Sequence, residues 1–137
     1  MVIRGINLSL LLSALFFLAG CASAPRPSGP DPVLVRRLAQ EAADQVRRCY
    51  RRPKVASEAK QIVTRLRVKF TPDGQLAQLP ELVWQRSVTP AAAPFAPRMV
   101  EAASLAIIRC APIRLPPEVH AGGWDELEFT FSPRGLG

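Results

Sequence analysis

The sequence predicts an α+β domain, in which a small antiparallel sheet of three strands is covered by two main helices. Two stretches place their apolar residues at helical spacing, and two others alternate apolar with polar residues as half-buried strands do. A further stretch follows a turn and is expected to pair back as a strand. The order along the chain is helix, strand, strand, helix, strand. Helices and strands that are segregated in this way favour an antiparallel sheet with the helices packed on it.

The first predicted helix begins at Asp31-Pro32 and ends at about Cys49. An aspartate accepts hydrogen bonds from the free amides of a helix start, and proline is tolerated at the first helical position. At about 100° per residue, one narrow arc carries the inward residues Val35, Leu38, Ala42, Val46 and Cys49. The other side carries the arginines Arg36, Arg37, Arg47 and Arg48. The helix is therefore amphipathic, and Cys49 points toward the core.

Residues 62–70 alternate strictly and predict a half-buried strand. The next residues, 71–74, read Thr-Pro-Asp-Gly and predict a turn, because proline presets one backbone angle and glycine accepts a left-handed one. Residues 76–84 then pair back as the second strand of a hairpin. Pro80 interrupts that strand and donates no hydrogen bond, so the strand is an edge there or begins at Glu81.

The second predicted helix ends at Cys110, where Ala111-Pro112 stops it. Its inward stripe at helical spacing consists of Met99, Ala102, Ala103, Ala106 and Cys110. The third predicted strand alternates the apolar residues Leu127, Phe129 and Phe131 with Glu128 and Thr130. Pro133 is expected to close the domain.

The amino terminus predicts export. Residues 1–20 have one positive charge, Arg4, followed by an apolar core of the length typical of a signal peptide, which is shorter than a membrane span. Leu18-Ala19-Gly20-Cys21 resembles the lipobox of bacterial lipoproteins, which implies that Cys21 is lipidated and anchors the chain to a membrane. Ala22 after the cysteine implies the outer rather than the inner membrane. The alternative is an uncleaved anchor with a chance cysteine.

The rest of the chain is expected to be a tether over 21–32, rich in Pro, Ser and Gly, and one domain over 33–134. Lipidation of Cys21 leaves Cys49 and Cys110 as an even pair in an oxidising compartment, which predicts a disulfide between them. The alternative is two buried free thiols.

The chain is basic, with a formal net charge of +7. A cluster on and after the first helix suggests contact with anionic head groups or other anionic surfaces, and it comprises Arg36, Arg37, Arg47, Arg48, Arg51, Arg52 and Lys54. An ordinary solvated helix face is the more common explanation of such a cluster and ranks before this one. Nucleic acid is not expected as a partner, because the few aromatic residues form no evident stacking platform.

An enzymatic function is not predicted. His120 is the only histidine, no Gly-x-Ser-x-Gly elbow occurs, and no cluster of His, Cys, Asp and Glu has metal-ligand spacing. No phosphate-cradling glycine loop is present either. We therefore expect no cofactor, no metal and no catalytic residues.

Several motifs together resemble the carboxy-terminal domain of TolA, within the wider TonB-like group. They are Gln45 to Cys49, Leu66 to Phe70, Pro72-Asp73-Gly74, Cys110-Ala111-Pro112 with Leu115-Pro116, Trp124, and Phe129 to Pro133. The resemblance covers nearly all of residues 33–134. Gly122-Gly123 departs from it by lengthening the stretch before Trp124, and we expect neither the inner-membrane anchor nor the long spacer of that group.

The resemblance implies a domain that grips partners in the cell envelope. Full-length members of the group transmit force from a proton-driven motor, whereas a tether of about ten residues spans at most about 35 Å. We therefore expect a binding module that captures an extended peptide of an envelope protein at a sheet edge, supplied by the second or third strand. The alternatives are a sheet with no accepting edge and an inner-membrane energy-transducer component for transport or envelope integrity.

Overall fold

The computed structural model describes residues 31–121, 123 and 125–137. The predicted signal peptide, Cys21 and most of the predicted tether lie outside these residues, as does Trp124. Within the described residues, no helix is both long and apolar enough to cross a membrane.

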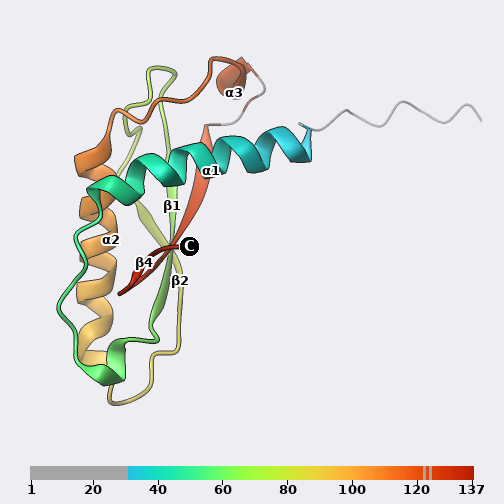
Figure 1. The fold of residues 1–137 in the computed structure, drawn as a ribbon. Helices are drawn as coiled ribbons and strands as arrows, with labels where there is room; N and C mark the ends of the chain where they lie inside the picture. Colours follow the sequence, from blue (N-terminus) through green and yellow to red (C-terminus); the bar gives the residue numbers. More distant parts are fainter. Residues whose placement is uncertain (1–30, 122, 124) are drawn as a thin grey trace, which may run out of the picture.

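The described residues form an α+β domain, which confirms the predicted fold class (Figure 1). Its main helices are α1 (Pro32–Cys49) and α2 (Ala96–Cys110), and its strands are β1 (Val63–Lys69), β2 (Glu81–Arg86), β3 (Glu126–Ser132) and β4 (Gly135–Leu136). Three single turns complete it: η1 (Ser57–Ala59), η2 (Ala93–Phe95) and α3 (Glu118–Ala121). All strand pairs are antiparallel, in the order β2-β1-β3-β4.

The prediction of a three-stranded sheet that ends before Pro133 was wrong, because β4 is a fourth strand. The chain turns after β3, and Leu136 pairs with Phe131 while Gly135 pairs with Ser132. Leu136 is only 8% exposed, so the last residues add an apolar side chain to the core. A two-residue strand is too short to show an alternating pattern, which is why its sequence gave no signal.

Helix α1 has the predicted bounds and start. Asp31 Oδ1 accepts a hydrogen bond from the Val33 amide at 2.9 Å, and Pro32 occupies the first turn. Leu38, Ala42 and Val46 are buried, as the apolar arc predicts. In Figure 1, α1 crosses the strands while α2 runs alongside them.

The hairpin of β1 and β2 is confirmed, but its second strand begins at Glu81, the later of the two predicted starts. Before it, Phe70 and Leu76 form only an isolated bridge. Pro80 has no amide hydrogen, so regular pairing starts after it. Thr64 pairs with Gln85 and Arg67 with Glu81.

The core lies between the helices and one face of the sheet. The burial of β1 and β3 alternates, and the buried face carries Leu66, Val68, Phe129 and Phe131. These side chains pack with Ala42 and Val46 of α1 and with Ala103, Ala106 and Ile107 of α2. The other face of the sheet, hereafter the open face, carries the polar residues of the same strands.

Candidate functional site: an exposed sheet edge

Strand β2 is the terminal strand of the sheet, with β1 on one side only. Among the described residues no strand pairs with its outer edge. Strand β3, the other predicted edge, lies inside the sheet between β1 and β4. The Gly137 amide also donates to the Thr130 carbonyl at 3.1 Å, which extends the cover of β3. Only residues 130–132 of β3 are covered in this way. No described strand lies along any part of the outer edge of β2, so β2 is the more completely open of the two predicted edges.

The edge of β2 carries exposed apolar side chains. Leu79, just before the strand, is 74% exposed, and Leu82 within it is 49% exposed. Leu82 pairs with Leu66, which is fully buried on the helix-covered face. Leu82 therefore lies on the apolar side of the sheet, where about half of it is exposed to solvent. An open strand edge next to apolar side chains is a template for pairing with another chain.

A β-bulge determines which face each side chain of β2 occupies. The register passes from Arg65 opposite Trp84 to Leu66 opposite Leu82, so Val83 is an extra residue. Without it, Leu82 and Trp84 would share a face, because side chains alternate with a period of two. With it, Leu82 lies on the helix-covered side and Trp84 on the open face.

Two arginines hold Trp84 on the open face. The guanidinium carbon of Arg86 lies 4.3 Å from the centroid of the Trp84 ring, and that of Arg65 lies 4.9 Å from it. Both distances are within the range of cation–π attraction. The indole is therefore a fixed, flat surface beside the open edge.

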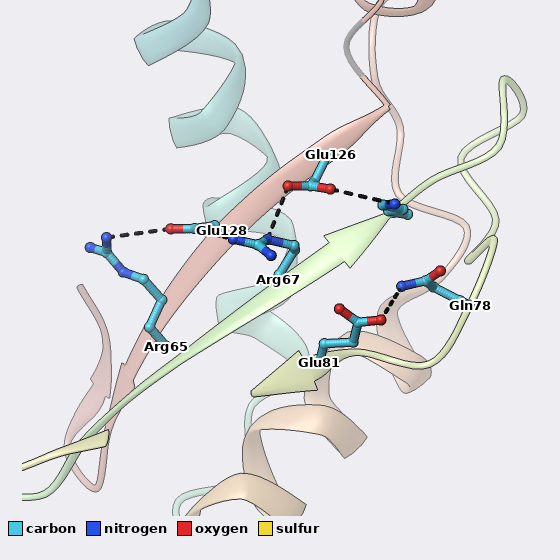
Figure 2. A network of polar contacts seen from close by, with 7 residues as sticks. Arg65, Arg67, Gln78, Glu81, Glu126 and Glu128 are labelled. Carbon is cyan, nitrogen blue, oxygen red and sulfur yellow. Dashed lines mark hydrogen bonds and ion pairs between the residues drawn. The ribbon is translucent and has the colours of Figure 1, made fainter. Parts of the chain in front are cut away.

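The open face of β1 and β3 is a ladder of ion pairs (Figure 2). Arg67 contacts Glu126 at 3.0 Å and Glu128 at 3.2 Å, and Arg65 contacts Glu128 at 3.4 Å. The carboxylates of β3 are thus occupied by cations of β1. On β2, Glu81 accepts a hydrogen bond from Gln78 at 2.6 Å, while Arg86 has no carboxylate partner among the described residues. Of the two charged ends of β2, the Arg86 end is therefore the one available to an acidic group.

The predicted disulfide is present and joins the ends of the two main helices. Cys49 and Cys110 are bonded, with their Cα atoms 5.6 Å apart. The next residue, Tyr50, donates from Oη to the Ser132 carbonyl at 2.8 Å, and its ring centroid lies 5.3 Å from that of Phe131. Burial raises the pKa of Tyr50 to about 12, with Arg52 opposing the rise, so the phenol is a neutral donor at neutral pH.

The seven residues of the predicted basic cluster are all exposed: Arg36, Arg37, Arg47, Arg48, Arg51, Arg52 and Lys54. Several of them already have partners on α1: Arg37 pairs with Glu41 at 3.7 Å, Arg47 pairs with Asp44, and Arg48 donates to the Asp44 carbonyl at 3.2 Å. The rows of arginine on α1 are therefore partly neutralised. This arrangement fits a solvated helix face better than a dedicated anion site.

Other residues considered from the sequence lie apart from the edge. His120 is half-buried on α3, and the described part of the chain holds no group of three metal-ligating side chains. Cys21 lies outside the described residues.

Comparison with known proteins found no matching family, no matching curated protein and no matching solved structure. The likeness to TolA and TonB domains thus rests on the motifs quoted above.

Sequence reasoning missed the bulge and the exposure of Leu82. Pro80 indicated a late start of regular pairing as one of two possibilities, but an extra residue in a strand leaves no composition signal when Leu, Val and Trp follow one another. The register between β1 and β2 decides which of these three side chains faces solvent.

Proposed function

We propose that this chain is a lipid-anchored protein of the bacterial envelope that binds a partner protein by adding an extended segment of that partner to the edge of β2. The observation that carries this proposal is the open outer edge of β2 with exposed Leu79 and Leu82 beside it. The lipobox at Cys21 and the resemblance to TolA and TonB domains support the envelope location, on the periplasmic side of a membrane and at the outer membrane rather than the inner.

The two faces of β2 specify the partner's sequence. Main-chain hydrogen bonds to the edge supply affinity, and alternate side chains supply specificity. A side chain of the added strand next to Leu82 enters the apolar side of the sheet, whereas its neighbours lie beside Trp84 and Arg86 on the open face. The favoured partner segment therefore alternates apolar residues with polar ones and carries a carboxylate near Arg86.

The edge also has features that limit pairing between copies of the protein. β2 is only six residues long, contains a bulge and follows Pro80, and its ends are charged by Glu81 and Arg86. Short, bulged and charged edges are how sheet proteins avoid indiscriminate association. Such an edge fits a strand of matching pattern better than a second copy of β2.

The partner is first identified by photo-crosslinking from position 82 in a didermal host, with position 108 as the matched control. Ile108 is also a half-exposed apolar residue, 40% exposed, but it lies on α2. A synthetic peptide of the segment crosslinked at position 82 then serves as the ligand for binding measurements.

Leu82→Lys is expected to weaken binding of that peptide by about tenfold, because the apolar contact is lost and a charge is buried in its place. Ile108→Lys is expected to leave binding unchanged. Amide hydrogen exchange in residues 81–86 is expected to slow when the peptide binds. Equal effects of the two substitutions, or unchanged exchange in β2, would contradict strand addition.

A further inference from the structure

An open pocket of about 530 Å³ is lined by four cationic side chains from three segments of the chain. Arg52 and Lys54 follow α1, Lys60 follows η1, and Arg134 lies in the turn between β3 and β4. Pro53, Val55 and Pro133 complete the lining. We call this set of seven residues the basic pocket.

The charges of the basic pocket are not neutralised in the described structure. None of its four cations forms an ion pair with a described carboxylate, in contrast to Arg37 and Arg47 on α1 and to the ladder on the open face. Among the described residues, no carboxylate lines it. A further cation, Arg98, donates from Nη1 to the Lys54 carbonyl at 3.2 Å. Like charges this close repel one another, and an anion between them relieves that repulsion.

Contacts outside the pocket fix its walls. Tyr50 Oη donates to the carbonyl of Ser132, the residue before Pro133. Ser132 Oγ donates to the Gly135 carbonyl at 3.1 Å, across the turn that carries Arg134. Arg98 holds the other wall at Lys54. The backbone φ of Pro53 and of Pro133 is fixed by the ring. The backbone that presents these cations is therefore in place before any ligand arrives.

We infer that the basic pocket binds a phosphate-bearing anion, either free in solution or carried by a lipid head group. Phosphate suits these residues, because a guanidinium matches its oxygens in a bidentate manner and lysines supply point charges around it. The pocket volume and its four cations favour a group with two or more negative charges over a single carboxylate. This site is separate from the edge of β2, and of the predicted basic cluster it takes only Arg52 and Lys54.

The position of the basic pocket allows a lipid-borne phosphate to reach it. An 18-residue helix is about 27 Å long, and the pocket follows the end of α1 opposite to the predicted tether. The predicted tether of about ten residues spans at most about 35 Å, which exceeds the length of α1, so a chain anchored at Cys21 can place the pocket on a head group of the same membrane.

The test is a calorimetric titration of pyrophosphate into the full chain, in a non-ionic detergent at low ionic strength. It measures the affinity of the chain for pyrophosphate. The variant Lys54→Gln/Lys60→Gln/Arg134→Gln is expected to bind about tenfold more weakly, through loss of three exposed charge contacts of modest individual strength. The matched control Arg36→Gln/Arg37→Gln/Arg48→Gln removes the same charge from α1 and is expected to change the affinity by less than about twofold. Equal weakening by the two variants, or no binding of pyrophosphate to the wild type, would overturn the site.

Two further measurements complete the test. Lys60→Gln alone is expected to weaken binding in the same direction, which covers the case in which the triple variant does not fold. In vesicles without pyrophosphate, the exchange of amides 52–60 is compared between phosphatidylcholine alone and phosphatidylcholine with phosphatidylglycerol. If exchange is slower with phosphatidylglycerol, and the variant Lys54→Gln/Lys60→Gln/Arg134→Gln loses this slowing, the bound phosphate belongs to a lipid. If exchange is equal in the two kinds of vesicle, the bound phosphate is a free anion.

Discussion

Replacing both Cys49 and Cys110 by alanine is expected to lower the free energy of unfolding by about 4 kcal/mol, because the bond closes a loop between residues 61 positions apart. In the chain-entropy account, a loop of this size restricts the unfolded chain by about that amount. For a small domain this is a large share of a total stability of about 5–15 kcal/mol. The bond also joins the ends of the two helices that cover the sheet, so its loss loosens the layer behind the β2 edge.

Denaturant unfolding of the full chain in a non-ionic detergent measures this effect. The wild type with a reducing agent serves as the matched control and is expected to unfold like the double variant. The double variant itself is expected to be insensitive to the reducing agent. A loss below about 1 kcal/mol would show that the bond contributes little to the folded domain.

Gly74→Ala is expected to destabilise the domain by about 3 kcal/mol or more, as the sum of backbone strain and a steric clash. Gly74 has a φ of +81°, which side chains with a Cβ rarely adopt. A Cβ built there would lie 2.0 Å from the carbonyl oxygen of Ile113. That oxygen belongs to backbone, so relief requires the whole segment to move.

The segment that would have to move is fixed by two sets of hydrogen bonds. The Ile113 amide donates to the Gly74 carbonyl at 2.8 Å. The side-chain amide of Gln45 both donates to the Arg114 carbonyl and accepts from the Arg114 amide, each at 2.8 Å. The hairpin turn is thus packed directly against the chain after α2.

Gly123→Ala is the matched control for Gly74→Ala. Gly123 also has a positive φ, +77°, but a Cβ there meets no described atom within 4 Å. Its replacement is expected to cost only about 1–2 kcal/mol of backbone strain. Equal losses of unfolding free energy for the two variants, measured by the same denaturant titration, would contradict a clash at Gly74.

The helices and the hairpin were predictable because their signals are local. Asp31-Pro32 specifies the start of α1, the alternation of residues 62–70 specifies β1, and both cysteines follow an apolar stripe that faces the core. β4 and the bulge at Val83 were not predictable, since each depends on pairing with a strand distant in the sequence. The general rule is that periodicity reports which face of an element is buried and leaves the neighbours in the sheet undetermined.

The candidate sites also differ in whether their sequence signals are local or depend on residues that the fold brings together. The disulfide was predicted because two cysteines remain after lipidation of Cys21 and the expected compartment is oxidising. The disulfide is confirmed. The arginine cluster was predicted from its position on one helix face, yet Arg37 and Arg47 have carboxylate partners one helical turn away. Lys60 and Arg134 were not predicted as partners of Arg52, because only the fold brings residues so distant in the chain to one pocket.

Export and lipidation at Cys21 are the central claim, since the identity of the partner and the reach of the domain both depend on them. The most direct measurement is incorporation of labelled palmitate in a didermal host. The wild type is expected to be labelled, Cys21→Ser is expected to be unlabelled, and the control Cys110→Ser is expected to keep its label. Absence of label on the wild type, with an intact amino terminus, would contradict a lipid-anchored protein and favour an inner-membrane energy-transducer component.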